Sequence, residues 1–189
     1  KNDSYYDYNN MFNGSENLKT IGKIINMYPS NLSSMFSECK RLRYLPEFIN
    51  PNFSRINTYP YATTGYMFQN CYSLRTIPED FLNQIYGVWT SNYSTLFYNG
   101  FNNCYTLDEI RGLNPQTGIM NSNTFSSTFY QCFRLKNIIF ALQDDGTPYP
   151  VNWKNQTISL NKIGYSNIGD DYLISFNSGI TADKSVRDD

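Results

Sequence analysis

The chain has 189 residues and a formal net charge of −1, which is enough material for one domain with a substantial core. Charged residues make up 16% of it, so the extended basic field that a binder of nucleic acid backbones needs is excluded. No apolar run approaches the roughly 20 residues needed to cross a bilayer. Because the sequence begins at Lys1 without a signal peptide, we expect a processed protein or a piece of a larger polypeptide.

Residues 1–10 are polar and rich in tyrosine, and we interpret them as a lead-in to a repeated motif. The motif reads Phe-x-x-Cys-x-x-Leu-x-x-Leu/Ile, and its copies contain all four cysteines of the chain. The first copy has serine in the cysteine position. The copies are Phe12/Ser15/Leu18/Ile21, Phe36/Cys39/Leu42/Leu45, Phe68/Cys71/Leu74/Ile77, Phe101/Cys104/Leu107/Ile110 and Phe129/Cys132/Leu135/Ile138.

Each copy has two halves with different apolar spacing. In the second copy, Leu32, Met35, Phe36 and Cys39 have the spacing i, i+3, i+4, i+7 of one helix face. This predicts a helix of about two turns, which is too short to persist alone. The following Leu-x-x-Leu/Ile half predicts a short strand, with proline at its end in two copies (Pro46 and Pro78).

A short helix followed by a short strand cannot bury its apolar face, but stacked copies can. We therefore predict an α/β fold in which residues 11–142 form a repeat solenoid, with short helices on one side and a parallel sheet on the other. The motif phenylalanines should then be stacked neighbours in one core.

Three segments between copies are longer than the motif requires, namely residues 50–61, 86–92 and 114–118. Their content of Pro, Gly, Asn and Tyr is typical of ordered surface loops. Residues 143–163 lack the motif, and the Asp145-Gly146 step predicts a hairpin, followed by a strand at 157–160. We expect this segment to be a C-terminal β cap and residues 164–189 to be a tail or a connection.

The best copies, Met35 to Pro46 and Met67 to Pro78, have the pattern Met-Phe-x-x-Cys-x-x-Leu-x-x-Leu/Ile-Pro. This pattern resembles the BspA-like class of leucine-rich repeats, which includes repeats of mycoplasma surface lipoproteins. Residues 139–160 are similar to the closing cap of repeat proteins from gut Bacteroides and their phages. The resemblance covers residues 8–163 and implies a leucine-rich-repeat fold. It implies a setting outside the cell, because such repeats occur in adhesins, secreted surface proteins and phage virion proteins.

The cysteines are interpreted as buried free thiols, because packed helices lie about 8–10 Å apart and a disulfide needs Cα atoms within about 7 Å. A zinc site is not expected, since Cys-x-x-Cys pairs and histidine are both absent. The lack of histidine also excludes Ser-His-Asp and Cys-His catalysis. We expect no metal and no cofactor.

Two sets of exposed residues are candidates for binding. The first comprises aromatic residues of the inserted loops, which suit sugar rings and protein interfaces or anchor the loops: Tyr59, Tyr61, Tyr86, Trp89 and Tyr93. The second comprises positions between the motif leucine and isoleucine, which stacking would align as a ribbon or leave as a solvated surface: Arg43, Tyr44, Arg75, Thr76, Asp108, Glu109, Lys136 and Asn137.

Carboxylate chemistry is the one enzymatic alternative. Glu79 and Asp80, with Asp108 and Glu109, follow the motif leucines of adjacent copies, and glycoside hydrolysis needs only two carboxylates at a suitable separation. The competing interpretation is that these are solvated loop acids.

The sequence favours a non-enzymatic recognition or structural module displayed on a virion or outside a cell. A bacteriophage tail or fibre component is the first interpretation, and a bacterial surface adhesin or a carboxylate-dependent polysaccharide depolymerase are the alternatives. Expected partners are other virion or surface proteins and a cell-surface glycan, without nucleic acid or a membrane span.

Overall fold

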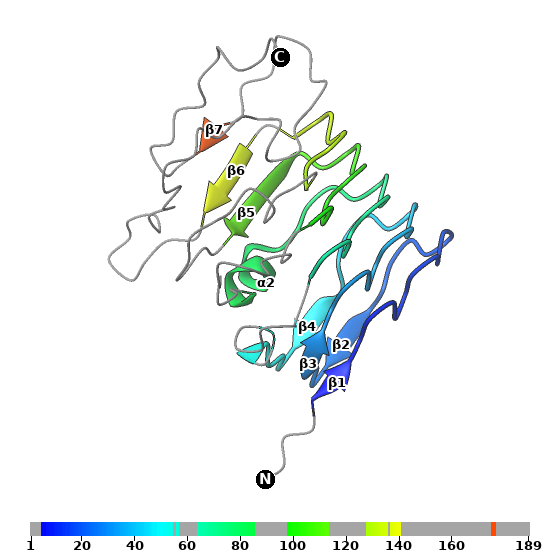
Figure 1. Cartoon of the computed structure of the whole chain (residues 1–189), viewed down its shortest axis with the longest axis vertical. Helices are drawn as coiled ribbons and strands as arrows, with labels where there is room; N and C mark the ends of the chain where they lie inside the picture. The colour runs from blue at the N-terminus through cyan, green and yellow to red at the C-terminus, as the bar shows by residue number, and fades with distance from the viewer. Residues whose placement is uncertain are drawn as a thin grey trace.

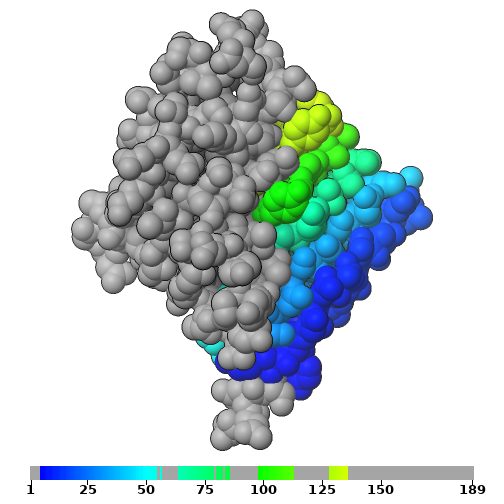
Figure 2. Space-filling view, viewed as in Figure 1, coloured from blue at the N-terminus to red at the C-terminus, as the bar shows by residue number. Residues whose placement is uncertain are grey.

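The computed structural model describes residues 5–54, 56, 64–85, 98–113, 128–135, 137–140 and 175–176. Within these ranges the motif copies lie side by side in chain order, from the blue N-terminal copy to the yellow-green fifth copy (Figure 1). They form parallel bands across the visible surface (Figure 2).

The described strands are short and all their pairings are parallel. Strand β1 (Tyr6–Asp7) pairs with β3 (Pro29–Asn31), and β2 (Lys23–Ile25) pairs with β4 (Glu47–Ile49). The third sheet has the order β5-β6-β7, formed by β5 (Glu109–Leu113), β6 (Asn137–Phe140) and β7 (Ser175–Phe176). Strand β1 lies in the expected lead-in and β7 in the expected tail, so both segments contribute pairing that the sequence did not predict.

The Phe-x-x-Cys halves are hydrogen-bonded turns where the sequence predicted short helices. In the first copy the Met11 N–H donates to the Tyr8 carbonyl at 3.2 Å, and the Ser15 N–H donates to the Phe12 carbonyl at 3.1 Å. The third residue of each turn, Asn10 and Gly14, has a φ of 60° and 74°. A type II turn requires a positive φ at its third residue. Such a residue interrupts an α-helix.

Positive φ recurs two residues before and two residues after the motif phenylalanine. The residues before it are Asn10, Ser34, Tyr66 and Asn99, and those after it are Gly14, Glu38, Asn70, Asn103 and Gln131. In the first three copies, the N–H groups at both positions and at the phenylalanine itself donate to carbonyls of the next copy. Phe36 and Phe68, for example, donate to the carbonyls of Met67 and Gly100 at 2.9 and 2.8 Å.

The motif phenylalanines form one column through the core, which confirms that part of the prediction. Successive ring centroids from Phe12 through Phe36, Phe68 and Phe101 to Phe129 are 5.4, 5.6, 5.3 and 5.7 Å apart, with interplanar angles of 14° or less. Met11, in the first copy, is 53% exposed, whereas its equivalents Met35 and Met67 are 0% and 1% exposed. The first copy thus covers its neighbour's core and has none of the described copies on its own outer side.

The four cysteines are free and fully buried, as their interpretation as apolar core residues predicted. Each Sγ lies close to the phenylalanine carbonyl of the preceding copy, at 3.0–3.2 Å, and donates a weak hydrogen bond to it. Ser15 occupies the same slot in the first copy, the outermost of the described copies. The cysteine column therefore links copies through backbone acceptors.

The prolines begin elements instead of closing strands. Pro46 lies directly before β4, and Pro78 is the N-cap of helix α2 (Glu79–Gln84). Helix α2 buries Phe81 and Leu82 in the core, and the Phe81 ring stacks on that of Phe48 at 4.9 Å. The helix therefore fastens the start of one insertion to the stack. The expected cap at 143–163 lies outside the described residues.

The inward and outward assignments predict different effects of neighbouring substitutions. Leu74 is fully buried between copies, so Leu74→Ala should lower the free energy of unfolding by about 2–5 kcal/mol by leaving a cavity. Arg75 is exposed, so Arg75→Ala should change it by about 0.5 kcal/mol or less. Urea denaturation of both variants measures the difference, and equal midpoints would contradict the assignment.

Burial also predicts how the thiols react. It raises the pKa of Cys39 to about 11 and that of Cys132 to about 12, so little thiolate forms at pH 8. Labelling by a thiol reagent should be slow in buffer and should reach all four cysteines in denaturant. The raised pKa values also make stability depend on pH. The contribution of the protonated thiols to the free energy of unfolding is present at neutral pH and is lost as the pH rises through the folded-state pKa values. Rapid labelling of the folded chain would refute the burial.

Candidate functional site

The residues that follow the motif leucine align on the exposed side of the stack, as the sequence predicted. The Arg43 N–H donates to the Lys19 carbonyl at 3.4 Å, the Arg75 N–H to the Arg43 carbonyl at 3.1 Å, and the Asp108 N–H to the Arg75 carbonyl at 3.3 Å. These backbone bonds fix four equivalent positions side by side. The ribbon of outward-facing residues is therefore a defined surface.

A hollow of about 570 Å³ opens on this surface, between the first three copies. Its volume lies within the range usual for small-ligand sites. It is lined by Lys19, Thr20, Arg41, Arg43, Tyr44 and Ser73. All of these occupy the positions immediately around the motif leucines Leu18, Leu42 and Leu74. The burial of Leu42 between Arg41 and Arg43 turns both arginine side chains outward.

The described lining of the hollow is cationic and includes a half-exposed aromatic ring. Lys19, Arg41 and Arg43 are all exposed, and within the described part of the chain none of them has a carboxylate within 4 Å. Tyr44 is 50% exposed. Three cations beside an aromatic face and two hydroxyl groups can bind an anionic group and contact an apolar or sugar face at the same time.

Two of the six lining residues, Arg43 and Tyr44, were predicted as binding residues. Lys19 and Thr20 occupy the same two positions in the degenerate first copy, so aligning that copy with the others would have found them. Arg41 and Ser73 precede their motif leucines, and sequence reasoning assigned no role to this position. Arg75 and Thr76 are exposed on the same ribbon but do not line the hollow.

The acidic residues of the ribbon are paired with arginines. Asp108 accepts a hydrogen bond from Arg134 Nε at 3.0 Å, and Glu109 accepts from Arg111 Nε at 2.5 Å and Nη2 at 3.2 Å. Asp80 accepts from the Phe81 N–H at 3.1 Å at the start of α2, and the side chain of Glu79 lies outside the described residues. The two carboxylates of the ribbon are thus held by cations of neighbouring positions.

The remaining predicted binding residues lie outside the described part of the chain. These are the loop residues Tyr59, Tyr61, Tyr86, Trp89 and Tyr93, the ribbon residue Lys136, and the side chain of Asn137, whose backbone begins β6. Their roles stay predictions.

Sequence reasoning missed a second column of side chains on the turn side of the stack. The residue after the motif cysteine is Lys40, Tyr72, Tyr105 or Phe133 in successive copies. Tyr72 and Tyr105 stack with centroids 4.8 Å apart, and Tyr105 and Phe133 stack at 5.5 Å. Phe133 is 43% exposed. Alignment of the copies would have found this column, because the residue after the cysteine is aromatic in three of them.

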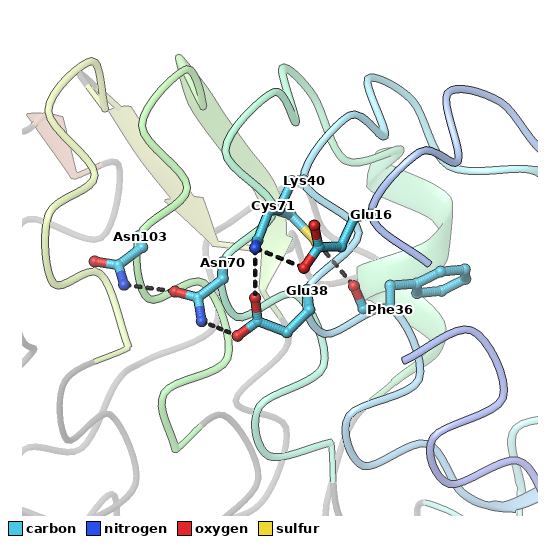
Figure 3. A network of polar contacts seen from close by, with 7 residues as sticks. All are labelled: Glu16, Phe36, Glu38, Lys40, Asn70, Cys71 and Asn103. Carbon is cyan, nitrogen blue, oxygen red and sulfur yellow. Dashed lines mark hydrogen bonds and ion pairs between the residues drawn. The ribbon is translucent and has the colours of Figure 1, made fainter. Parts of the chain in front are cut away.

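A polar network runs beside this column (Figure 3). Asn103 Nδ2 donates to Asn70 Oδ1 at 2.5 Å, and Asn70 Nδ2 donates to Glu38 Oε1. Lys40 Nζ contacts Glu16 at 2.7 Å and Glu38 at 3.8 Å, and its hydrogen bond with Glu16 raises the pKa of Lys40. The network joins four copies, and Glu38, Asn70 and Asn103 within it are left-handed residues, so it supports the turns.

The described residues contain no group of three or more histidine, cysteine or acidic side chains placed to hold a metal. In the same ranges, no helix has the length and apolar content needed to span a membrane. Comparison of the chain with protein-family models, curated proteins and solved structures gave no significant match.

Proposed function

We propose that this chain is a non-enzymatic recognition module displayed on a virion or outside a cell, and that the cationic hollow is its binding site. The observation that carries the proposal is the joint placement of Lys19, Arg41, Arg43 and Tyr44 around one hollow of about 570 Å³. Small-ligand sites are concave and combine apolar or aromatic surface with a few placed polar or charged groups, and this hollow has both.

The proposed scaffold is a leucine-rich-repeat solenoid of the BspA-like class. The phenylalanine column, the cysteine column and the parallel pairing of equivalent strands support it. The turns, in place of helices, are compatible with this scaffold because they still bring the motif phenylalanines, cysteines and leucines of the second to fifth copies to the core. The extended parallel sheet and the C-terminal cap belong to this proposal.

The proposed setting is a bacteriophage tail or fibre, where the module contacts the host surface or a neighbouring virion protein. The support for it is the resemblance of the repeats to those of gut bacterial surface proteins and their phages. A bacterial surface adhesin is the alternative, and it would use the same hollow. Labelling of native particles with an antibody against this chain separates the two settings.

The binding proposal is tested on an array of bacterial surface glycans with the full chain and matched variants. Wild-type chain should bind a subset of glycans, and Tyr44→Ala and Arg43→Gln should each weaken the signal by about tenfold or more, as loss of a contacting ring or a charged hydrogen bond does. Thr76→Ala, on the same ribbon but outside the hollow, should leave it unchanged.

Two results would refute this function. The first is binding that all three variants retain in full. The second is turnover of a bound glycan that Glu79→Gln or Glu109→Gln abolishes, because the chain would then be a polysaccharide depolymerase acting through carboxylates.

A further inference from the structure

We propose that the hollow binds an acidic sugar, with a carboxylate or sulfate held by Arg41, Arg43 and Lys19 and the sugar ring lying against Tyr44. This inference rests on the proposed function and deepens it, since it names the chemical class of the ligand. The shared chemistry is an anionic group on a saccharide, whether it is a uronate or a sulfate ester.

The charge of the lining is the first argument. The whole chain has 16 acidic and 15 basic residues, so a random selection of surface charges would be mixed. Among the described residues that line the hollow, three are cations and none is acidic. The nearby cations Lys23 and Lys40, in contrast, are paired with Glu47 and Glu16 at 3.1 and 2.7 Å. The cations of the hollow are left for an anion from outside.

The rigidity of their placement is the second argument. Arg41 and Arg43 flank Leu42, which is fully buried, so both side chains leave the surface from a fixed backbone. The backbone bond from Arg43 to Lys19 holds the third cation beside them in the neighbouring copy. Two planar guanidinium groups at one site suit the bidentate geometry of a carboxylate or sulfate.

The remaining lining residues favour a sugar over other carriers of an anion. The half-exposed Tyr44 ring offers an apolar face with a polar edge, which suits the C–H face of a pyranose. Thr20 and Ser73 carry hydroxyl groups, which can donate hydrogen bonds to sugar hydroxyls and accept hydrogen bonds from them. A nucleic acid would need basic charge along a longer path, whereas the fourth position of the same ribbon is Asp108.

The test is isothermal titration of the intact chain with polygalacturonate, dextran sulfate and neutral dextran of matched length. Binding to at least one of the two acidic polymers and none to neutral dextran is expected. The apparent Kd should rise by about tenfold or more between 50 and 500 mM NaCl, because salt screens exposed charges. Polygalacturonate and dextran sulfate separate a carboxylate ligand from a sulfate ligand.

The double variant Arg41→Gln/Arg43→Gln should weaken binding of the acidic polymer by about tenfold or more. Tyr44→Ala should also weaken it, and Tyr44→Phe should retain most of the affinity if the ring face is the contact. The matched controls are Arg134→Gln and Arg75→Gln, which remove exposed arginines outside the hollow. Circular dichroism of every variant should match that of the wild type.

Several outcomes would overturn the inference. They are equal binding of neutral and acidic polymers, equal loss in the hollow variants and the controls, and tighter binding of a 12-nucleotide DNA strand or a polyglutamate peptide than of either acidic polysaccharide. If the array shows glycan binding through Tyr44 but neither acidic polymer binds, the acidic-sugar inference alone fails. If no glycan binds in either experiment, the proposed function fails with it.

Discussion

The structure depends on backbone hydrogen bonds between successive copies, and these depend on residues with positive φ. In the three interfaces between the first four copies, N–H groups two residues before the phenylalanine, at the phenylalanine and two residues after it donate to the next copy, and in the fourth interface Phe101 and Asn103 donate in the same way. In the second copy the donors Ser34, Phe36 and Glu38 lie 2.9, 2.9 and 2.8 Å from their acceptors. A left-handed conformation costs a residue other than glycine about 1–2 kcal/mol. The backbone hydrogen bonds and the stacked phenylalanines of each interface offset this cost.

The side chains at the left-handed positions add to the same interfaces. Asn70 and Asn103 lie in a chain of amide hydrogen bonds that begins at Glu38 (Figure 3). Asparagine also tolerates the left-handed region better than most residues. The residue that enables the turn thus also connects neighbouring copies, which explains why polar residues dominate these positions beside an apolar core.

The core could be predicted from the sequence because the motif has one phenylalanine, one cysteine and one leucine at constant spacing. The helix could not be told from tandem turns by apolar spacing, because over eight residues both arrangements bring Leu32, Met35, Phe36 and Cys39 to one side. The distinguishing signal was Asn10 and Gly14 in the first copy, which are poor residues for a helix interior and good ones for turns. Glu38 and Tyr66 occupy the same conformation without any such signal, because tertiary hydrogen bonds impose it.

The candidate site could likewise be predicted only in part. Position in the motif indicates that Arg43 and Tyr44 face outward, since they lie between its two apolar positions, Leu42 and Leu45. The hollow itself depends on the lateral distance between copies and on the side chains of three of them at once. In the sequence, Arg41 is 22 residues or more from both Lys19 and Ser73. Only the packing of copies brings the three residues together.

A scaffold held together by backbone atoms leaves its outward side chains free to vary. The bonds from Arg43 to Lys19, from Arg75 to Arg43 and from Asp108 to Arg75 use only N–H and carbonyl groups. Substitution of these side chains therefore changes the charge of the ribbon without removing a backbone hydrogen bond of the stack. The ribbon is cationic at the first three of these positions and acidic at the fourth, where Asp108 binds Arg134. The cations that line the hollow come from the first two copies, so Lys19, Arg41 and Arg43 define the proposed site and the rest of the ribbon does not.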